Sequence, residues 1–189
     1  MRIKLYVNMD GVLATLDQRI ETLERIYEQG YFLNLKASEN VVDCISLLAK
    51  DKTNFNVYIL SSVLENSKYA FDEKNKWINK YLPFIDDEHR IFIKYGVNKT
   101  DYISDFKNNC VLLDDYAPSL VSWRDQGGIS IQLINSDNFL NKNWDGMQIE
   151  YSLNPLIMSY KMKRIIFEEY VKLNMKNHPE TTELIQSIN

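Results

Sequence analysis

The stretch that most limits what this chain can fold into is residues 3–14, which read IKLYVNMDGVLA. It opens as an apolar, β-rich run and then presents Asn8 and Asp10, followed by Gly11. Side chains two positions apart on an extended strand point the same way, so Asn8 and Asp10 should face one spot. Gly11 can bring the backbone close to a ligand and offer its N–H to an anion. We therefore expect a ligand site at the carboxyl end of a strand, although an ordinary strand end with a polar turn gives the same pattern.

Apolar runs of strand length alternate with helical patterns along the rest of the chain. This alternation predicts a parallel, doubly wound α/β sheet, and 189 residues suit a single domain. The predicted strands are 3–7, 55–60, 90–93, 110–115 and 129–134, and the predicted helices are 15–30, 38–48, 66–82, a short one around 120–123, and 155–175 within a flanking C-terminal segment 155–189. Trp77 lies at helical spacing with apolar residues, which favours a core position over stacking on a base.

Two further predicted strands end in polar side chains. Ser61 and Ser62 follow the second apolar run, where a hydroxyl can bond a phosphate oxygen or, alternatively, cap the next helix. Asp114 and Asp115 end the fourth run, and adjacent carboxylates are costly unless they share a cation. Because the carboxyl ends of parallel strands meet at one edge of a sheet, we expect these groups to converge with the polar cluster of the first strand.

Taken in order, these features resemble the four motifs of the haloacid dehalogenase-like (HAD) phosphatases. The segment NMDGVLA, residues 8–14, resembles the first motif, D-x-D-G-x-x-A/T, with an amide in place of the first carboxylate. The residues that match the other motifs are Ser61 for the second, Lys99 for the third, with Lys94 as its competitor, and the pair Asp114 and Asp115 for the fourth. The likeness covers residues 3–135.

A closer likeness is to 5'-nucleotidases of the 5'(3')-deoxyribonucleotidase type, and it is carried by the segments VNMDGVLA, EKNKWINKYLP, NKTDY and VLLDDY. In such a protein, residues 15–54 would form a small helical cap that covers the site and selects the substrate. A crossover helix with a preceding loop is the alternative. Tyr27, Tyr31 and Phe32 would then either stack on a base or form the core of the cap itself.

The resemblance implies phosphoryl transfer through an aspartyl-phosphate, with Mg²⁺ as the cofactor. The residue at position 8 would attack phosphorus, and Asp10 would protonate the leaving oxygen and later activate water. The implied phosphate ligands are Ser61, Ser62, Lys99 and the backbone N–H groups around Gly11, and the implied metal ligands are Asn8, Asp10, Asp114 and Asp115, with Asp115 favoured over Asp114 as the direct ligand.

Asn8 is where the sequence departs from the pattern, because an amide is a poor nucleophile and a weaker Mg²⁺ ligand. Three interpretations stay open: an engineered change that traps substrate, a natural pseudo-phosphatase that binds phosphate ligands without turnover, or slow hydrolysis by direct attack of water with Asp10 as the base. We predict a Mg²⁺-dependent phosphomonoester hydrolase of 5'-nucleotidase type that acts on nucleoside monophosphates. The alternative is a catalytically inactive module that binds a nucleotide or another phosphate ligand.

Composition argues against several other classes of function. The net charge of −4 provides no basic surface for nucleic acid, and no apolar run is long enough to span a membrane. Cys44 and Cys110 sit in apolar runs, which favours buried free thiols over a disulfide. The N-terminus lacks the pattern of a signal peptide, so a cytoplasmic location is expected. His89 and His178 have no metal-ligand companion at useful spacing. The sequence does not indicate an oligomeric state.

Overall fold

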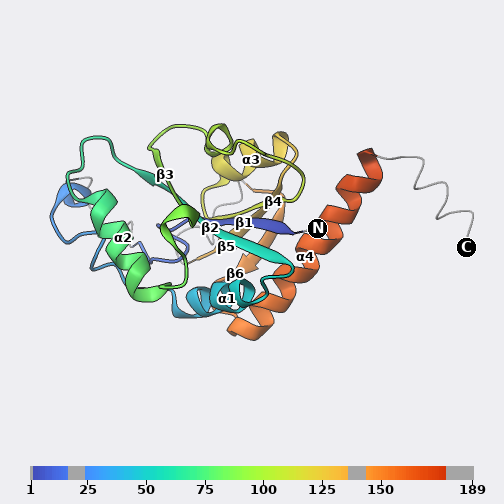
Figure 1. Ribbon diagram of the computed structural model, residues 1–189, viewed down its shortest axis with the longest axis horizontal. Helices are drawn as coiled ribbons and strands as arrows, with labels where there is room; N and C mark the ends of the chain where they lie inside the picture. Colours follow the sequence, from blue (N-terminus) through green and yellow to red (C-terminus); the bar gives the residue numbers. More distant parts are fainter. Residues whose placement is uncertain (1, 17–23, 136–143, 178–189) are drawn as a thin grey trace, which may run out of the picture.

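The computed structural model describes residues 2–16, 24–135 and 144–177, and it is built on a six-stranded sheet in the order β3-β2-β1-β4-β5-β6 (Figure 1). The strands are β1 (Ile3–Val7), β2 (Phe55–Val63), β3 (Arg90–Lys94), β4 (Cys110–Asp114), β5 (Ile129–Ile134) and β6 (Met147–Glu150). Every neighbouring pair is parallel. The predicted doubly wound parallel α/β fold is therefore confirmed.

The strand order reverses direction between β1 and β4. From β1 the chain builds outward through β2 to β3, and then it returns to place β4 on the other side of β1 before continuing to β5 and β6. In open α/β sheets, ligands bind in the crevice outside the carboxyl ends of the strands at such a switch point. The polar residues that come after β1 and β4 therefore lie where this fold ordinarily places a site.

Helices cover both faces of the sheet. In Figure 1, α3 (Ala117–Asp125) lies above the sheet and α1 (Glu39–Lys50) lies below it, while α4 (Pro155–Asn177) runs diagonally from beside α1 to the upper right. The helix α2 (Ala70–Tyr81) shares one buried cluster with α1, α4 and alternate residues of the strands, and α3 belongs to a second cluster on the opposite face. Burial on both faces explains why β4 reads as an almost continuous apolar run before its aspartate.

Several boundaries differ from the sequence prediction. The strand β2 continues through both serines to Val63, so neither Ser61 nor Ser62 caps a helix, and α2 begins only at Ala70, whose N–H donates to Ser67 Oγ at 3.2 Å. The short edge strand β6 is an addition to the predicted strands. Only one of its four residues is buried, so it carries little apolar signal.

The predicted helix over residues 15–30 is wrong for the part that can be described. Residues 17–23 lie outside the described ranges, and the chain after them forms a single 3-10 turn, η1 (Arg25–Tyr27), and then further turns up to position 34. Gly30, the predicted stop, has a φ of +89°, a left-handed conformation that ends helical geometry. The predicted helix beginning after Ser38 is confirmed as α1.

The described residues also test several predictions about single side chains. Trp77 is fully buried and its Nε1 donates to the Leu35 carbonyl at 2.8 Å, so it belongs to the core as predicted. Cys44 and Cys110 are buried free thiols, also as predicted. His89 contacts Asp86 and Asn56 with its two ring nitrogens; His178 lies outside the described residues. None of the helices in the described ranges has the length and apolar character to cross a membrane.

Candidate functional site

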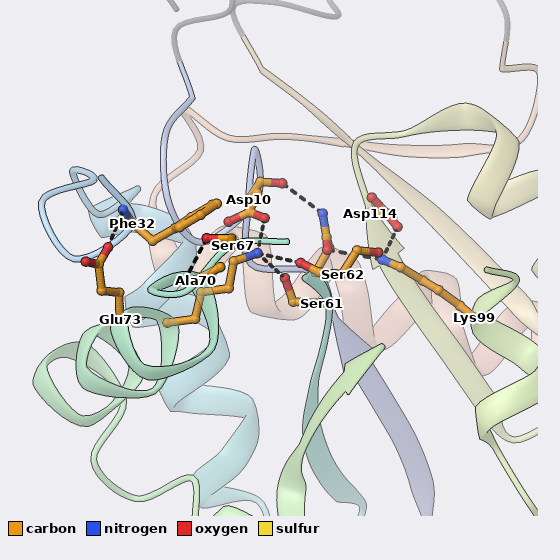
Figure 2. Close-up of polar contacts among 11 residues, drawn as sticks. Asp10, Phe32, Ser61, Ser62, Ser67, Ala70, Glu73, Lys99 and Asp114 are labelled. Carbon is orange, nitrogen blue, oxygen red and sulfur yellow. Dashed lines mark hydrogen bonds and ion pairs between the residues drawn. The ribbon is translucent and has the colours of Figure 1, made fainter. Parts of the chain in front are cut away.

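A cavity of about 540 Å³ lies at the carboxyl ends of β1 and β4, at the switch point of the sheet. Its polar lining comes from separate parts of the chain that only the fold brings together: Asn8, Asp10, Ser62, Lys74, Lys99, Asp114, Asp115 and Ser119. Figure 2 shows Asp10 beside Ser61 and Ser62, with Lys99 and Asp114 next to this group. Two of the predicted site residues, Ser61 and Gly11, are buried and do not line the cavity.

Asn8 is held at both ends of its amide. Its Nδ2 donates to the Asp10 carbonyl at 2.8 Å, and its Oδ1 accepts a hydrogen bond from Lys99 Nζ at 3.1 Å. The opposite amide orientation would turn N–H groups toward an ammonium and an oxygen toward a carbonyl, so the network sets the orientation. A carboxylate at this position could not donate to the Asp10 carbonyl.

Lys99 joins Asn8 to the acidic pair. It belongs to the 3-10 turn η3 (Lys99–Tyr102), is only 6% exposed, and donates to Asp114 Oδ2 at 2.6 Å. The other oxygen of Asp114 accepts the Tyr116 N–H at 3.2 Å. The competing Lys94 is exposed and pairs with Glu65 at 2.6 Å, outside the cavity lining. The geometry thus places Lys99, and not Lys94, in the site.

Asp115 packs directly on Gly11. Gly11 has a φ of +78°, and a Cβ added there would overlap the Asp115 carboxylate, so only glycine permits this approach. Asn135 Nδ2 donates to Asp115 Oδ2 at 3.3 Å and to the Gly11 carbonyl at 2.9 Å. Burial, and then the charge of Asp114, raise the pKa of Asp115 to about 8.

The prediction that the Gly11 N–H binds an anion is wrong. That N–H donates to the Ala14 carbonyl at 2.8 Å, inside the tight turn at the end of β1. The glycine is required here for its positive φ and for the close approach of Asp115, and its hydrogen bond is already used within the turn.

The two carboxylate oxygens of Asp10 have different surroundings. Its Oδ2 pairs with Lys74 Nζ. Its Oδ1 is buried and has no hydrogen-bond partner among the described residues. A buried carboxylate oxygen without a partner is costly. It therefore marks a position where a metal ion, a water molecule or a substrate proton would be bound.

Lys74 is a site residue that the sequence prediction lacks. It is 1% exposed and also donates to Ser61 Oγ at 3.2 Å and to the Ser62 carbonyl at 2.7 Å. The sequence holds a signal for it, because Glu73 and Lys74 fall at the same helical spacing as the buried Ala70 and Trp77. Two adjacent opposite charges in the buried stripe of a helix indicate specific polar partners.

The segment 30–35 forms one wall of the cavity and is fixed by α2. Tyr31 and Phe32 line the cavity and are also packed into the core. Glu73, which is 5% exposed, accepts the N–H of Gly30 at 2.5 Å and of Phe32 at 3.1 Å. Tyr27 is 45% exposed and lies outside the cavity lining. Of the three aromatic residues considered for base stacking, Tyr31 and Phe32 are the ones in reach of a ligand.

The oxygen atoms of the site suit a Mg²⁺ ion held by few protein ligands. Mg²⁺ is usually bound through one or two carboxylates, waters and substrate phosphates. Asp10 and Asp115 line the cavity, and Asp10 Oδ1 has no hydrogen-bond partner among the described residues. Asp114 already accepts from Lys99 and from Tyr116. Within the described ranges, no group of three or more His, Cys, Asp or Glu side chains could hold a metal, so the ion would bind through one or two carboxylates, with water and phosphate oxygens as its other ligands.

Comparison with known proteins gives partial sequence matches. No protein-family model matches the chain. Over 83 residues it is 26% identical to proteins named "Putative 5'(3')-deoxyribonucleotidase" from Staphylococcus aureus strains Mu50 and MRSA252, a match that spans 43% of this chain and 44% of theirs. The chain resembles these relatives over less than half of either length.

A solved structure is also similar to this chain. It is a HAD family enzyme from Bacteroides thetaiotaomicron, an aspartate-to-alanine variant in complex with magnesium and inorganic phosphate. The two structures superpose with a TM-score of 0.43 at 14% sequence identity, over 75% of this chain and 100% of the other.

Proposed function

We propose that the protein is a Mg²⁺-dependent phosphomonoester hydrolase of 5'-nucleotidase type, acting at the cavity between β1 and β4. The observation that carries this proposal is the convergence of Lys99, Asn8 and the acidic residues at the switch point, together with Asp10 Oδ1, for which the described residues provide no hydrogen-bond partner. Buried ammonium groups attract phosphoryl oxygens, and a carboxylate oxygen without a partner can move a proton.

Each residue of the proposed site has its own task. Lys99 and Ser62, both in the cavity lining, would hold phosphoryl oxygens. Asp10 Oδ1 would accept a proton from the water that attacks phosphorus, and the leaving ester oxygen would take its proton from solvent water. Asn8 would keep the Asp10 backbone and Lys99 in place through its two hydrogen bonds. Because an amide is a poor nucleophile, direct attack by water is the route that suits this site.

The proposed metal ligands are Asp115 and the Asn8 carbonyl oxygen, and Asp10 lies beside them in the cavity with its Oδ1 kept for proton transfer. When bound, Mg²⁺ would neutralise charge on the phosphoryl oxygens. The neutral Asn8 leaves the metal with one carboxylate fewer than the HAD pattern provides, so we expect weak Mg²⁺ binding without substrate.

Nucleoside monophosphates are the substrate class that we propose. The cavity volume of about 540 Å³ lies in the range of small-molecule sites. Tyr31 and Phe32 on one wall, and Tyr95 and Tyr116 on the lining as well, offer aromatic surface to a flat base. The partial sequence likeness to the deoxyribonucleotidases supports the same class. Two free buried thiols suit a reducing compartment, so we place the protein in the cytoplasm.

Phosphate release from a panel of nucleoside monophosphates, with Mg²⁺ and with EDTA, tests the proposal. We expect slow, Mg²⁺-dependent release by the wild type, faster release by Asn8→Asp, and a loss of roughly 100-fold or more in Asp10→Asn. Binding without release, in both the wild type and Asn8→Asp, would favour the inactive binding module. Absence of both binding and release would overturn both functions.

A further inference from the structure

Lys74 is a buried cation that the proposed reaction does not yet use. It lies on the inner face of α2, next to Trp77 and Ile78, and is 1% exposed. Burying an ammonium group is unfavourable unless it is paired and its protons are bonded. A lysine kept at this position therefore requires a specific set of acceptors.

Its three acceptors account for all three protons. They are Asp10 Oδ2, Ser61 Oγ at 3.2 Å and the Ser62 carbonyl at 2.7 Å. An ammonium has three donors and no acceptor, so Lys74 keeps no proton for a phosphoryl oxygen. Lys99 differs, because the described residues supply it with two acceptors, Asn8 Oδ1 and Asp114 Oδ2. The two lysines are thus suited to different tasks.

The contacts of Lys74 decide which oxygen of Asp10 can act. Lys74 donates to Oδ2 of Asp10 and, at the end of β2, to Ser61 and Ser62, so the ion pair is held against this strand. The other oxygen, Oδ1, is buried and unpartnered among the described residues. The Phe32 ring lies with its centroid 4.5 Å from Lys74 Nζ and covers the ion pair. A fixed carboxylate with a single available oxygen is what directed proton transfer needs.

We propose that Lys74 is a positioning residue for Asp10: it holds Oδ2 and so presents Oδ1 to the reacting group. The expected effect of Lys74 on catalysis rests on the proposed function. The ion pair between Lys74 and Asp10 can be tested without that function.

A double-mutant cycle on turnover tests the catalytic consequence. Lys74→Met, Asp10→Asn and the double variant are compared for release of phosphate from a nucleoside monophosphate with Mg²⁺, in the wild type and again in Asn8→Asp. We expect Lys74→Met to lower kcat about 100-fold with little change in KM, since small misplacements of catalytic groups have effects of this size. In the Asp10→Asn background Lys74→Met should lower kcat no further, because residues that act as a unit are not additive. Lys76→Met, outside the buried stripe of the same helix, is the matched control and should keep kcat.

Two results would overturn the proposal. Equal losses from Lys74→Met with and without Asp10 would mean that the lysine acts independently of the carboxylate. A raised KM at constant kcat would mean that Lys74 binds the substrate itself. Should Lys74→Met fail to fold, Lys74→Gln retains a donor for Asp10 and should show a smaller loss of kcat that again disappears in the Asp10→Asn background.

The same cycle on melting temperature separates this proposal from the proposed function. If no ester is hydrolysed or bound by the wild type or by Asn8→Asp, the proposed function fails. The melting temperatures of the four proteins then still report on the pair. We expect the double variant to lose less than the sum of the two single losses, because each single variant leaves the other member of the ion pair without its partner. Additive losses would show that Lys74 does not hold Asp10 and would overturn the inference.

Discussion

At the scale of single residues, the site depends on a few positions whose side chains or backbone make specific contacts. Asn8 forms hydrogen bonds through both its Nδ2 and its Oδ1, so the N–H group of the amide is as much a part of the site as the oxygen. Gly11 combines a positive φ with a close approach of the Asp115 carboxylate. These positions are constrained by geometry, and each allows a substitution whose effect can be separated from general destabilisation.

Gly11→Ala should remove phosphate binding. The left-handed backbone costs a non-glycine residue about 1–2 kcal/mol, and the added Cβ would displace the Asp115 carboxylate. Gly127→Ala is the matched control, because Gly127 has a φ of +88° and open space around it. Both variants should lose stability in urea unfolding, Gly11→Ala the more because Asp115 must move, while only Gly11→Ala loses binding of inorganic phosphate in the presence of Mg²⁺. Equal phosphate affinity in the two variants would contradict the described packing of Asp115.

At the scale of elements, side chains of α2 hold two parts of the site in place. Glu73 holds the wall formed by residues 30–35, and Lys74 holds Asp10. Apolar runs and the polar residues after them are enough to predict β1, β2, β4 and the convergence of their ends. The spacing of Glu73 and Lys74 indicates that they are buried, but it does not give their roles, because only tertiary packing reveals their partners.

Glu73→Gln should loosen the wall segment. The amide has one acceptor where the carboxylate has two, and it brings an N–H group against backbone donors, so the free energy of unfolding should fall by about 1–3 kcal/mol. Hydrogen exchange at the amides of Phe32 and Leu33 should become faster. Asp72→Asn, on the exposed face of the same helix, should change neither quantity. Unaltered exchange at these two amides in Glu73→Gln would show that the carboxylate does not fix the wall.

At the scale of the whole molecule, the order of the strands determines where the site lies. The helices α1 and α4 pack together on one face of the sheet. Cys44 on α1 contacts Met162 on α4, with 3.8 Å between the sulfur atoms, and burial raises the pKa of this thiol to about 12. The parallel sheet can be predicted from the alternation of elements. The edge strand β6 cannot, because a short half-exposed strand is recognised only by its neighbour β5.

Stability should therefore fall as the pH rises above about 9. The unfolded chain loses the Cys44 proton near the ordinary thiol value of 9.0, whereas the folded chain keeps it until about 12, so the unfolded state binds fewer protons in this window. The loss attributable to Cys44 between pH 8 and pH 10 is about 1.4 kcal/mol. Urea unfolding of the wild type and Cys44→Ala at the two pH values checks this. The slope should be smaller in Cys44→Ala, and identical slopes would contradict the buried, protonated thiol.

The most direct test of the central claim is a crystal structure of the wild-type protein grown with Mg²⁺ and inorganic phosphate. We predict density for a phosphate ion between Ser62 and Lys99, with a cation bound by Asp115 next to Asp10 and with Lys74 still paired to Asp10 Oδ2. An empty cavity at saturating phosphate and Mg²⁺, or a phosphate bound away from the carboxyl ends of β1 and β4, would contradict the account.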